Sequence, residues 1–305
     1  MMRKPYHCRM SLTQDPSHSA EAVVPVSVPT KAPAFGVIII GDEILSGKRM
    51  DKHLAKVIEL LSARGLPLAY ADYVGDDPAR ITRALARAFT SGDVVFSFGG
   101  IGATPDDHTR QCAASALGVP LALHPEAAAL IYERMADMAR EKGIPYEPDR
   151  ADNRHRLNMA MFPLGASIIP NPYNKIAGFS CEGQSVGEGT GRVHFVPGFP
   201  VMAWPMVEWV LDAYYASWFS QVLMSEKSII VYGAMESTLT PLMEELERLH
   251  PAIKVFSLPS VDHPQYGRHI ELGVKGPAAH VTGAYAGLLS GLRQFELELG
   301  PELVR

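Results

Sequence analysis

Short runs of apolar and β-branched residues alternate with amphipathic segments from residue 35 onwards. In residues 51–63 the apolar positions Leu54, Val57 and Leu61 recur every three or four residues, a spacing that places them on one face of a helix. Such alternation predicts crossover units on a parallel sheet. The expected strands are residues 35–40, 66–74 and 93–98, and the expected helices between them are residues 51–63 and 77–89.

After residue 105 the pattern is mainly helical, and it then returns to short strands. We expect helices at residues 106–117, 125–142, 150–161 and 200–219, and strands at residues 167–170, 176–181 and 192–196. The last helix contains all three tryptophans of the chain, which favour burial in the core, with a contact between subunits as the alternative. This part of the chain therefore predicts an α/β domain.

A change of composition near Ser225 opens a smaller unit with a strand, helix, strand, strand, helix order. Its expected elements are residues 228–232, 236–250, 254–258, 269–274 and 278–298. We therefore predict a flexible leader at residues 1–32, a main domain at residues 33–222 and a small α+β domain at residues 223–305. Packing, dimerisation and closure of a pocket are the roles considered for the small domain.

Composition excludes several classes of protein. A formal net charge of −5 gives no electrostatic footprint for nucleic acid. Three cysteines without metal-ligand spacing indicate neither a disulfide framework nor a zinc site. The leader lacks the apolar core of a signal peptide, and no stretch approaches the ~20 apolar residues that span a bilayer. We expect a soluble cytoplasmic protein without a nucleic-acid or membrane partner.

The strand at residues 93–98 runs directly into Gly99, Gly100, Ile101 and Gly102. Glycines at such a position let backbone N–H groups approach an anion closely. The helix expected next would add its own free N–H groups and the positive end of its dipole. Because ligands of open α/β sheets bind at the carboxyl ends of the strands, Gly99, Gly100 and Gly102 are candidate phosphate-binding residues.

Thr104, Pro105, Asp106 and Asp107 follow the glycines and allow two interpretations. They fit a helix start, with Thr as the N-cap, Pro at the first position and Asp in the first turn. Carboxylates beside a phosphate site would also repel the anion unless a divalent cation lies between them, and Mg²⁺ commonly binds one or two carboxylates together with substrate phosphates. Asp106 and Asp107 are therefore candidate metal ligands.

A second acidic group follows the first strand at Asp42 and Glu43, and Asp51 opens the next helix. Right-handed crossovers would bring these residues and the glycine loop onto one rim of the sheet. Convergence of carboxylates there indicates metal-assisted phosphoryl or nucleotidyl chemistry, with Asp42 as a further metal ligand. Ordinary turn and helix-cap acids are the alternative, above all for Asp51.

Several motifs, taken in order, make the chain resemble a known family. They are residues 41–47, residues 99–107 with Thr109, Asn153 with residues 163–166, Asn171-Pro172, Gly178-Phe179 and residues 196–200. Together they resemble the molybdopterin-binding MogA/MoaB family, and most closely the N-terminal region of CinA-type competence/damage-inducible proteins. Spaced motifs in one order are more specific than a lone glycine loop.

The resemblance implies a three-layer α/β/α fold and two activities. MogA-like members bind molybdopterin and adenylylate it with Mg²⁺ and acids that match Asp51 and Asp107 or Asp106 here. CinA-type members resemble an ADP-ribose pyrophosphatase dependent on Mg, Mn or Co. Asp51 and Asp107 are thus the catalytic candidates. The further ligand-binding candidates are Thr104, Thr109, Asn171, Gly198 and Lys175, the last with a solvated loop lysine as the alternative.

Three functions therefore stay open from the sequence. The first is a metal-dependent nucleotide pyrophosphatase acting on an ADP-ribose-like substrate. The second is molybdopterin binding or adenylylation in molybdenum cofactor biosynthesis. The third is a non-catalytic, ligand-binding regulatory module, which the altered loop at residues 171–178 favours because it replaces small residues of the family pattern by Tyr and Lys. In each case we expect a small phosphorylated ligand, a nucleotide or a pterin, and a homo-oligomer.

Overall fold

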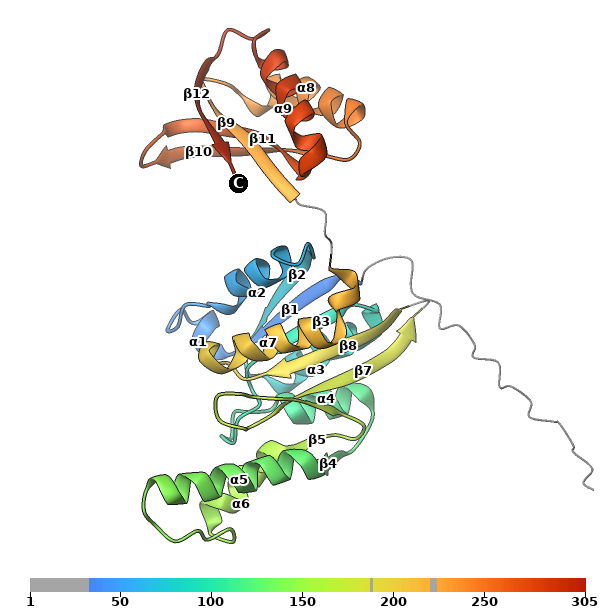
Figure 1. The fold of residues 1–305 in the computed structure, drawn as a ribbon, viewed down its shortest axis with the longest axis vertical. Coiled ribbons are helices and arrows are strands. Elements are labelled where there is room, and N and C mark those ends of the chain that lie inside the picture. Colours follow the sequence, from blue (N-terminus) through green and yellow to red (C-terminus); the bar gives the residue numbers. More distant parts are fainter. Residues whose placement is uncertain (1–32, 187–188, 220–223) are drawn as a thin grey trace, which may run out of the picture. The chain divides into compact units, whose positions relative to one another are not determined.

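The computed structural model describes residues 33–186, 189–219 and 224–305, shown in Figure 1. The predicted leader at residues 1–32 lies outside these ranges. Residues 33–219 and residues 224–305 each contain a sheet and a hydrophobic core of their own. The domain boundaries at residues 32 and 222 stay predictions.

The main sheet has six strands in the order β2-β1-β3-β8-β7-β6. The first four strands in this order are parallel, while β7 and β6 run antiparallel to their neighbours. This arrangement confirms the mostly parallel sheet. The strands are β1 (Phe35–Ile40), β2 (Leu68–Val74), β3 (Val94–Phe98), β6 (Ser167–Ile169), β7 (Gly178–Val186) and β8 (Gly189–Val196).

Helices cover both faces of the main sheet, because each central strand is apolar on both sides. In β1, Val37 and Ile39 belong to one core cluster, whereas Ile38 and Ile40 belong to the other. The first cluster is completed by α2 (His53–Ser62) and α7 (Pro200–Tyr214), and the second by α3 (Pro78–Ser91), α4 (Thr109–Leu117) and α5 (Pro125–Glu141). The three-layer α/β/α fold is thus confirmed.

The remaining elements of this part are short. A two-stranded antiparallel sheet joins β4 (Leu121–Leu123) to β5 (Met161–Pro163). The others are α1 (Asp42–Leu45), α6 (Ala151–Leu157) and the 3-10 turns η1 (Asn158–Ala160) and η2 (Ala216–Trp218). Among the described residues, no helix combines the length and the apolar character needed to cross a membrane.

The C-terminal part is an antiparallel sheet in the order β10-β11-β9-β12. Its elements are β9 (Met224–Tyr232), α8 (Glu236–Leu249), β10 (Lys254–His263), β11 (Gly267–Pro277), α9 (Ala278–Leu292) and β12 (Glu298–Val304). The sequence analysis missed β12, because Gly300 and Pro301 argue against a strand. Gly300 is accommodated because it lies against the Tyr232 ring and Ile230, where a Cβ would meet both at about 3 Å.

A buried polar network joins two strands of the main sheet, β7 and β8, to the end of α7. The Ser180 hydroxyl lies 2.7 Å from Nδ1 of His194, and the Tyr215 hydroxyl lies 2.8 Å from Nε2 of the same ring. No part of His194 is exposed. Burial, helped by the charge of Arg192, lowers the pKa of His194 to about 3. The imidazole is therefore neutral in the folded protein at any ordinary pH.

We predict that His194 makes stability fall in mild acid. Below pH 6.5, the ordinary pKa of histidine, the unfolded chain binds a proton on this ring, whereas the folded chain does not. The free energy of unfolding should thus lose up to about 1.4 kcal/mol per pH unit from this residue between pH 6.5 and the folded pKa. Urea titrations of wild type and His194→Gln at pH 7 and pH 5 check this; an equal pH dependence in both proteins would contradict it.

Candidate functional site

The loop after β3 is fastened to the first turn of α4 through its carbonyl groups. Thr109 holds two of them: its Oγ1 donates to the carbonyl of Gly99 at 3.1 Å, and its backbone N–H donates to the carbonyl of Gly100 at 3.0 Å. Thr109 is completely buried. This residue, predicted as a contact for the ligand, is therefore engaged with the loop itself.

Arg110 holds the next two carbonyls. Its Nη1 donates to the carbonyl of Ile101 and its Nη2 donates to that of Gly102, the second at 2.7 Å. Only 3% of Arg110 is exposed. Thr109 and Arg110 thus bind four carbonyls in succession, and we refer to these contacts as the Thr109–Arg110 clamp.

The clamp fixes the direction of the backbone N–H groups of residues 100–103. In a trans peptide the N–H points opposite to the C=O of the preceding residue. Because the carbonyls of residues 99–102 point towards α4, the four following N–H groups point away from it. Within the described part of the chain none of these four has a hydrogen-bond partner. Successive free N–H groups of this kind form an anion-binding concavity.

Glycine is required at the start of this loop. Gly99 has φ +94°, and a Cβ there would lie 2.5 Å from the carbonyl oxygen of Ile40. Gly100 has φ +68°, and a Cβ there would meet the Thr109 hydroxyl at 2.1 Å. Only glycine adopts such backbone angles without strain, so these positions shape the loop whichever ligand it binds.

The helix start expected at Asp106 is wrong, because α4 begins at Thr109. Asp107 instead closes a turn, in which its Oδ2 accepts from the backbone N–H of Thr104 at 2.9 Å and from the Thr104 hydroxyl at 2.6 Å. One N–H of the expected joint site of loop and helix N-terminus, that of Thr109, is bound to a loop carbonyl, and the joint site stays a prediction. Oδ1 of Asp107 has no protein partner within the described residues.

Acids gather at the same edge of the sheet. Asp42 and Asp76 exchange hydrogen bonds: the N–H of Asp42 donates to Oδ2 of Asp76 at 2.9 Å, and the N–H of Asp76 donates to Oδ1 of Asp42 at 3.2 Å. Burial raises the pKa of Asp76, and the charges of Asp42, Glu43 and Asp106 raise it further against the opposing hydrogen bond. The predicted Asp42 is therefore hydrogen-bonded to Asp76, and Asp106 acts on Asp76 through its charge.

Sequence reasoning missed Asp76, although a signal was present. Asp76 comes two residues after β2 ends at Val74, and β2 lies parallel to β1, which is followed by Asp42. Parallel neighbours end on one rim, so an acid after either strand reaches the same place. Among the described residues, no three His, Cys, Asp or Glu side chains are arranged to hold an ion by themselves.

Asp51 accepts hydrogen bonds from the start of α2 and from β2. Its Oδ1 accepts from the N–H of His53 at 2.8 Å, and its Oδ2 accepts from the N–H of Leu54 at 3.1 Å and from the Tyr73 hydroxyl at 2.8 Å. Burial and this last bond raise the pKa of Tyr73 to about 12. Asp51 therefore binds the first free N–H groups of α2, in line with the alternative interpretation of the sequence, and its catalytic role stays a prediction.

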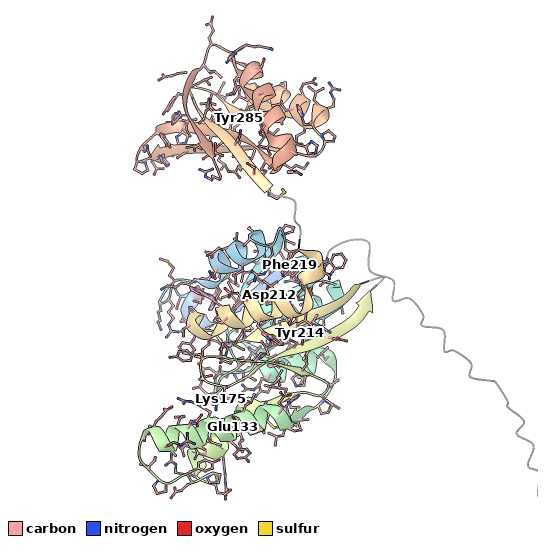
Figure 2. The ribbon with its side chains drawn as sticks, in the orientation of Figure 1. Glu133, Lys175, Asp212, Tyr214, Phe219 and Tyr285 are labelled. Carbon is pink, nitrogen blue, oxygen red and sulfur yellow. The ribbon has the colours of Figure 1, made fainter. Side chains whose placement is uncertain are left out.

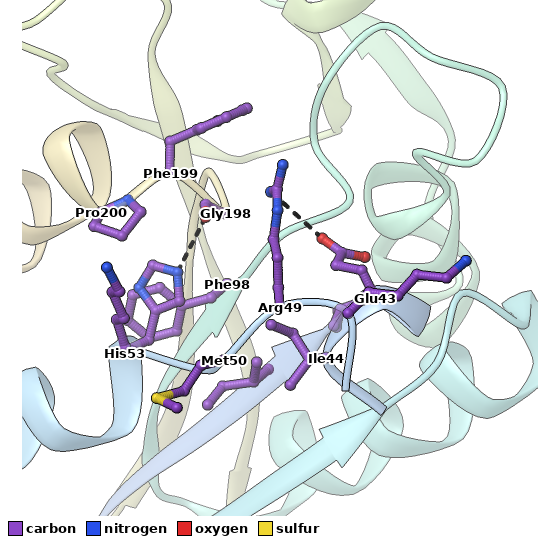
Figure 3. Close-up of a pocket in the computed structure, with 13 residues that line it drawn as sticks. Glu43, Ile44, Arg49, Met50, His53, Phe98, Gly198, Phe199 and Pro200 are labelled. Atoms are coloured by element: carbon purple, nitrogen blue, oxygen red, sulfur yellow. Dashed lines mark hydrogen bonds and ion pairs between the residues drawn. The ribbon is translucent and has the colours of Figure 1, made fainter. Parts of the chain in front are cut away.

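A cavity of about 470 Å³ lies at the carboxyl ends of β1 and β3, and Figure 3 shows its lining. Its wall includes Gly198, one of the residues predicted to bind the ligand, and the His53 imidazole, whose Nε2 lies 3.2 Å from the Gly198 carbonyl oxygen. His53 stacks on Phe98 at 4.4 Å, and burial lowers its pKa. The apolar residues of the lining are Ile39, Ile40, Ile44, Met50, Phe98, Phe199 and Pro200, and its basic residues are Lys48, Arg49 and Lys52.

A second cavity, of about 480 Å³, lies at the other end of the glycine loop. Ala103, Thr104 and Asp107 line it together with Arg110 and, from beyond α6, Asn158. Of residues 99–103, Ala103 lines this second cavity and none lines the first. The N–H groups of residues 100–103 point away from Arg110, which lines only this second cavity.

Two predicted ligand contacts lie away from the loop. The Lys175 ammonium pairs with Asp137 at 2.9 Å and with Glu133 at 3.3 Å, both on α5 (Figure 2). Asn171 is buried and donates to the Asn174 side chain at 2.8 Å, so it shapes its own turn. Neither residue lines either of the two cavities beside the loop.

Taken together, the fold and the loop define an α/β domain with a glycine-rich loop of free N–H groups and a cavity at the carboxyl edge of its parallel strands. The model of a family described as "probable molybdopterin binding domain" matches residues 36–216, and the chain belongs to this family. The family is thus the one that the sequence motifs resemble.

The matched region makes up different shares of the relatives' own lengths. A CinA-like protein of Gloeobacter violaceus is 31% identical over 228 residues, which are 74% of this chain and 50% of that protein. A protein of Pyrobaculum arsenaticum is 29% identical over 223 residues, 73% of this chain and 78% of its own length. The solved structure of CinA from Thermoplasma acidophilum is 28% identical, with a TM-score of 0.48 over 60% of this chain and 98% of that one.

We predict that Gly99→Ala strongly destabilises the protein. The added Cβ meets the Ile40 carbonyl and the φ of +94° is unfavourable, so the free energy of unfolding should fall by at least about 3 kcal/mol. The matched control is Gly143→Ala, which has φ +63° but open space around the Cβ, and which should lose about 1 kcal/mol. If urea titrations gave the same loss of stability for both variants, the clash with the Ile40 carbonyl would have no energetic cost and the prediction would be wrong.

For Asp51→Ala, we expect a loss of stability and no loss of ligand affinity. The change removes a helix cap, which costs about 1 kcal/mol, and Tyr73→Phe should lose part of the same amount. Thermal unfolding and a binding titration with ADP-ribose, both on the folded variant, check this. A stable variant that no longer binds ADP-ribose would contradict this and show that Asp51 belongs to the ligand site.

Proposed function

We propose that this chain binds a phosphorylated, nucleotide-like ligand and hydrolyses a diphosphate bond in it with the help of a divalent cation. The proposal depends mainly on the free N–H groups of residues 100–103, because these donors are fixed in place before any anion binds. An ADP-ribose-like substrate is what the resemblance to CinA-type proteins implies, and the first cavity, of about 470 Å³, falls in the size range of small-molecule sites.

The acidic group suits a cation that is shared with phosphate. Asp42 and Asp76 each use one oxygen for the other's backbone N–H, which leaves the second oxygen free, and Oδ1 of Asp107 is also free in the described residues. Repulsion among the neighbouring acids, seen in the raised pKa of Asp76, would be relieved by a positive ion. A bound Mg²⁺, Mn²⁺ or Co²⁺ would neutralise phosphate charge and favour ionisation of water.

The first cavity suits the organic part of the ligand. Phe98, in its wall, immediately precedes the loop, and Gly198 lies against Gly99, where a Cβ would be 3.5 Å from the Gly99 Cα. The apolar floor can take a ring face, and the basic residues Lys48, Arg49 and Lys52 at the wall can balance negative charge. Arg49 is in turn held near Glu43, at 3.8 Å.

In the proposed reaction a water oxygen forms a bond to one phosphorus and the bridging P–O bond breaks, which leaves two phosphate monoesters. The N–H groups of residues 100–103 hold the non-bridging oxygens and stabilise the charge that grows on them. Asp76, with its raised pKa, lies beside the other acids and can accept the proton that the water releases.

We predict that Asp76→Asn strongly lowers turnover and leaves the fold intact. Loss of this carboxylate should lower kcat for ADP-ribose with Mn²⁺ at least about 100-fold. Asp149→Asn, which changes a side chain that is 91% exposed, is the control and should keep full activity. If wild type cleaves ADP-ribose and EDTA stops it, but Asp76→Asn is as active, the assignment of this acid is wrong.

Molybdopterin binding or adenylylation is the second candidate, and the family match favours it. The same loop would hold the pterin's phosphate and the same cavity its ring. A titration with molybdopterin, with and without ATP and Mg²⁺, distinguishes the candidates from each other. Transfer of AMP supports this function, hydrolysis of ADP-ribose supports the first, and tight binding without either reaction identifies a non-catalytic regulatory module.

A further inference from the structure

We propose that Arg110 is a positioning residue for the anion: its buried guanidinium turns the loop N–H groups outward and places a fixed positive charge behind them. The proposal rests on the function proposed above. Arg110 lines the second cavity, with Ala103, and not the first, and the effect assigned to it passes through the two peptide groups whose carbonyls it binds.

The geometry of the two bonds carries the argument. The carbonyl of Ile101 and the N–H of Gly102 belong to one peptide plane, and the carbonyl of Gly102 and the N–H of Ala103 belong to the next. Because Arg110 binds both carbonyls from one side, both N–H groups must face the other side. The planar fork of a guanidinium suits two adjacent carbonyls, which a lysine ammonium would hold less rigidly.

The charge of Arg110 has no partner in direct contact. Within the described residues no carboxylate lies within ion-pair distance of its guanidinium, and its Nε has no hydrogen-bond partner although it is buried. Burial lowers the pKa of Arg110, and only the more distant charge of Asp107 opposes this. A buried cation with so little compensation is costly to the free protein.

An arriving phosphate would supply the missing compensation. Neutral donors such as the Thr109 hydroxyl can hold a carbonyl without this cost, as they do at Gly99. A cation behind the peptide planes adds two effects: it polarises each peptide so that its N–H becomes a stronger donor, and it attracts the anion in a region of low dielectric constant. The cost to the free protein is therefore offset when the ligand binds.

The test compares Arg110→Met and Arg110→Lys with wild type, using inorganic pyrophosphate in EDTA so that no cation contributes. We expect pyrophosphate affinity to fall at least about tenfold in Arg110→Met and by less in Arg110→Lys, as for loss of a charge-assisted hydrogen bond. Amide ¹⁵N–¹H signals of residues 100–103 should shift on titration in wild type and respond less in the Met variant. In turnover, kcat for ADP-ribose should fall and the Lys variant should recover part of it.

Arg64→Met is the matched control. Arg64 also donates to a backbone carbonyl, that of Leu60, and pairs with Asp212 on α7, but it lies outside the loop and both cavities. It should lose stability and keep pyrophosphate affinity. A purely structural Arg110 would behave in the same way.

Each outcome decides between the two proposals. If wild type binds pyrophosphate and folded Arg110→Met binds it equally well, the positioning role is wrong and the proposed function stands. If wild type shows neither binding nor amide shifts, in EDTA or with Mg²⁺ present, the proposed function itself fails. Should Arg110→Met not fold, Arg110→Lys decides, because it retains the charge and loses the fork: unchanged affinity and unchanged amide shifts would overturn the proposal.

Discussion

The hydrogen bonds of the Thr109–Arg110 clamp are the constraint on which the rest of the site depends. Four carbonyls bound on one side of a loop leave four N–H groups on the other, and this follows from the planarity of the peptide bond alone. The glycines permit the loop, α4 supplies the donors, and β3 fixes where the loop starts. The acids after β1 and β2 then lie on the same rim because these strands are parallel neighbours.

Much of this arrangement could be predicted from the sequence, for physical reasons. A hydrophobic run that ends in glycines and is followed by a helix indicates an anion site wherever the sheet is parallel, and Asp42 and Asp106 were placed on its rim by the same rule. Asp76 obeys that rule equally well and was overlooked. The large α/β part was predictable because its strands are apolar on both faces.

Other features could not be read from the pattern. Arginine is seldom buried, and the burial of Arg110 depends on carbonyls eight and nine residues earlier that face it only in the folded loop. A capping acid and a metal ligand look alike in sequence, and only the structure shows that Asp51 accepts from three donors. The partners of Lys175 lie about 40 residues away on α5, beyond any local signal.

The most direct test of the central claim is a crystal structure of the protein with pyrophosphate and Mg²⁺ bound. We expect the phosphate oxygens to lie within hydrogen-bond distance of the N–H groups of residues 100–103, on the side of the loop turned away from Thr109. A phosphate seated instead at the first turn of α4, in the cavity lined by Arg110, would contradict it.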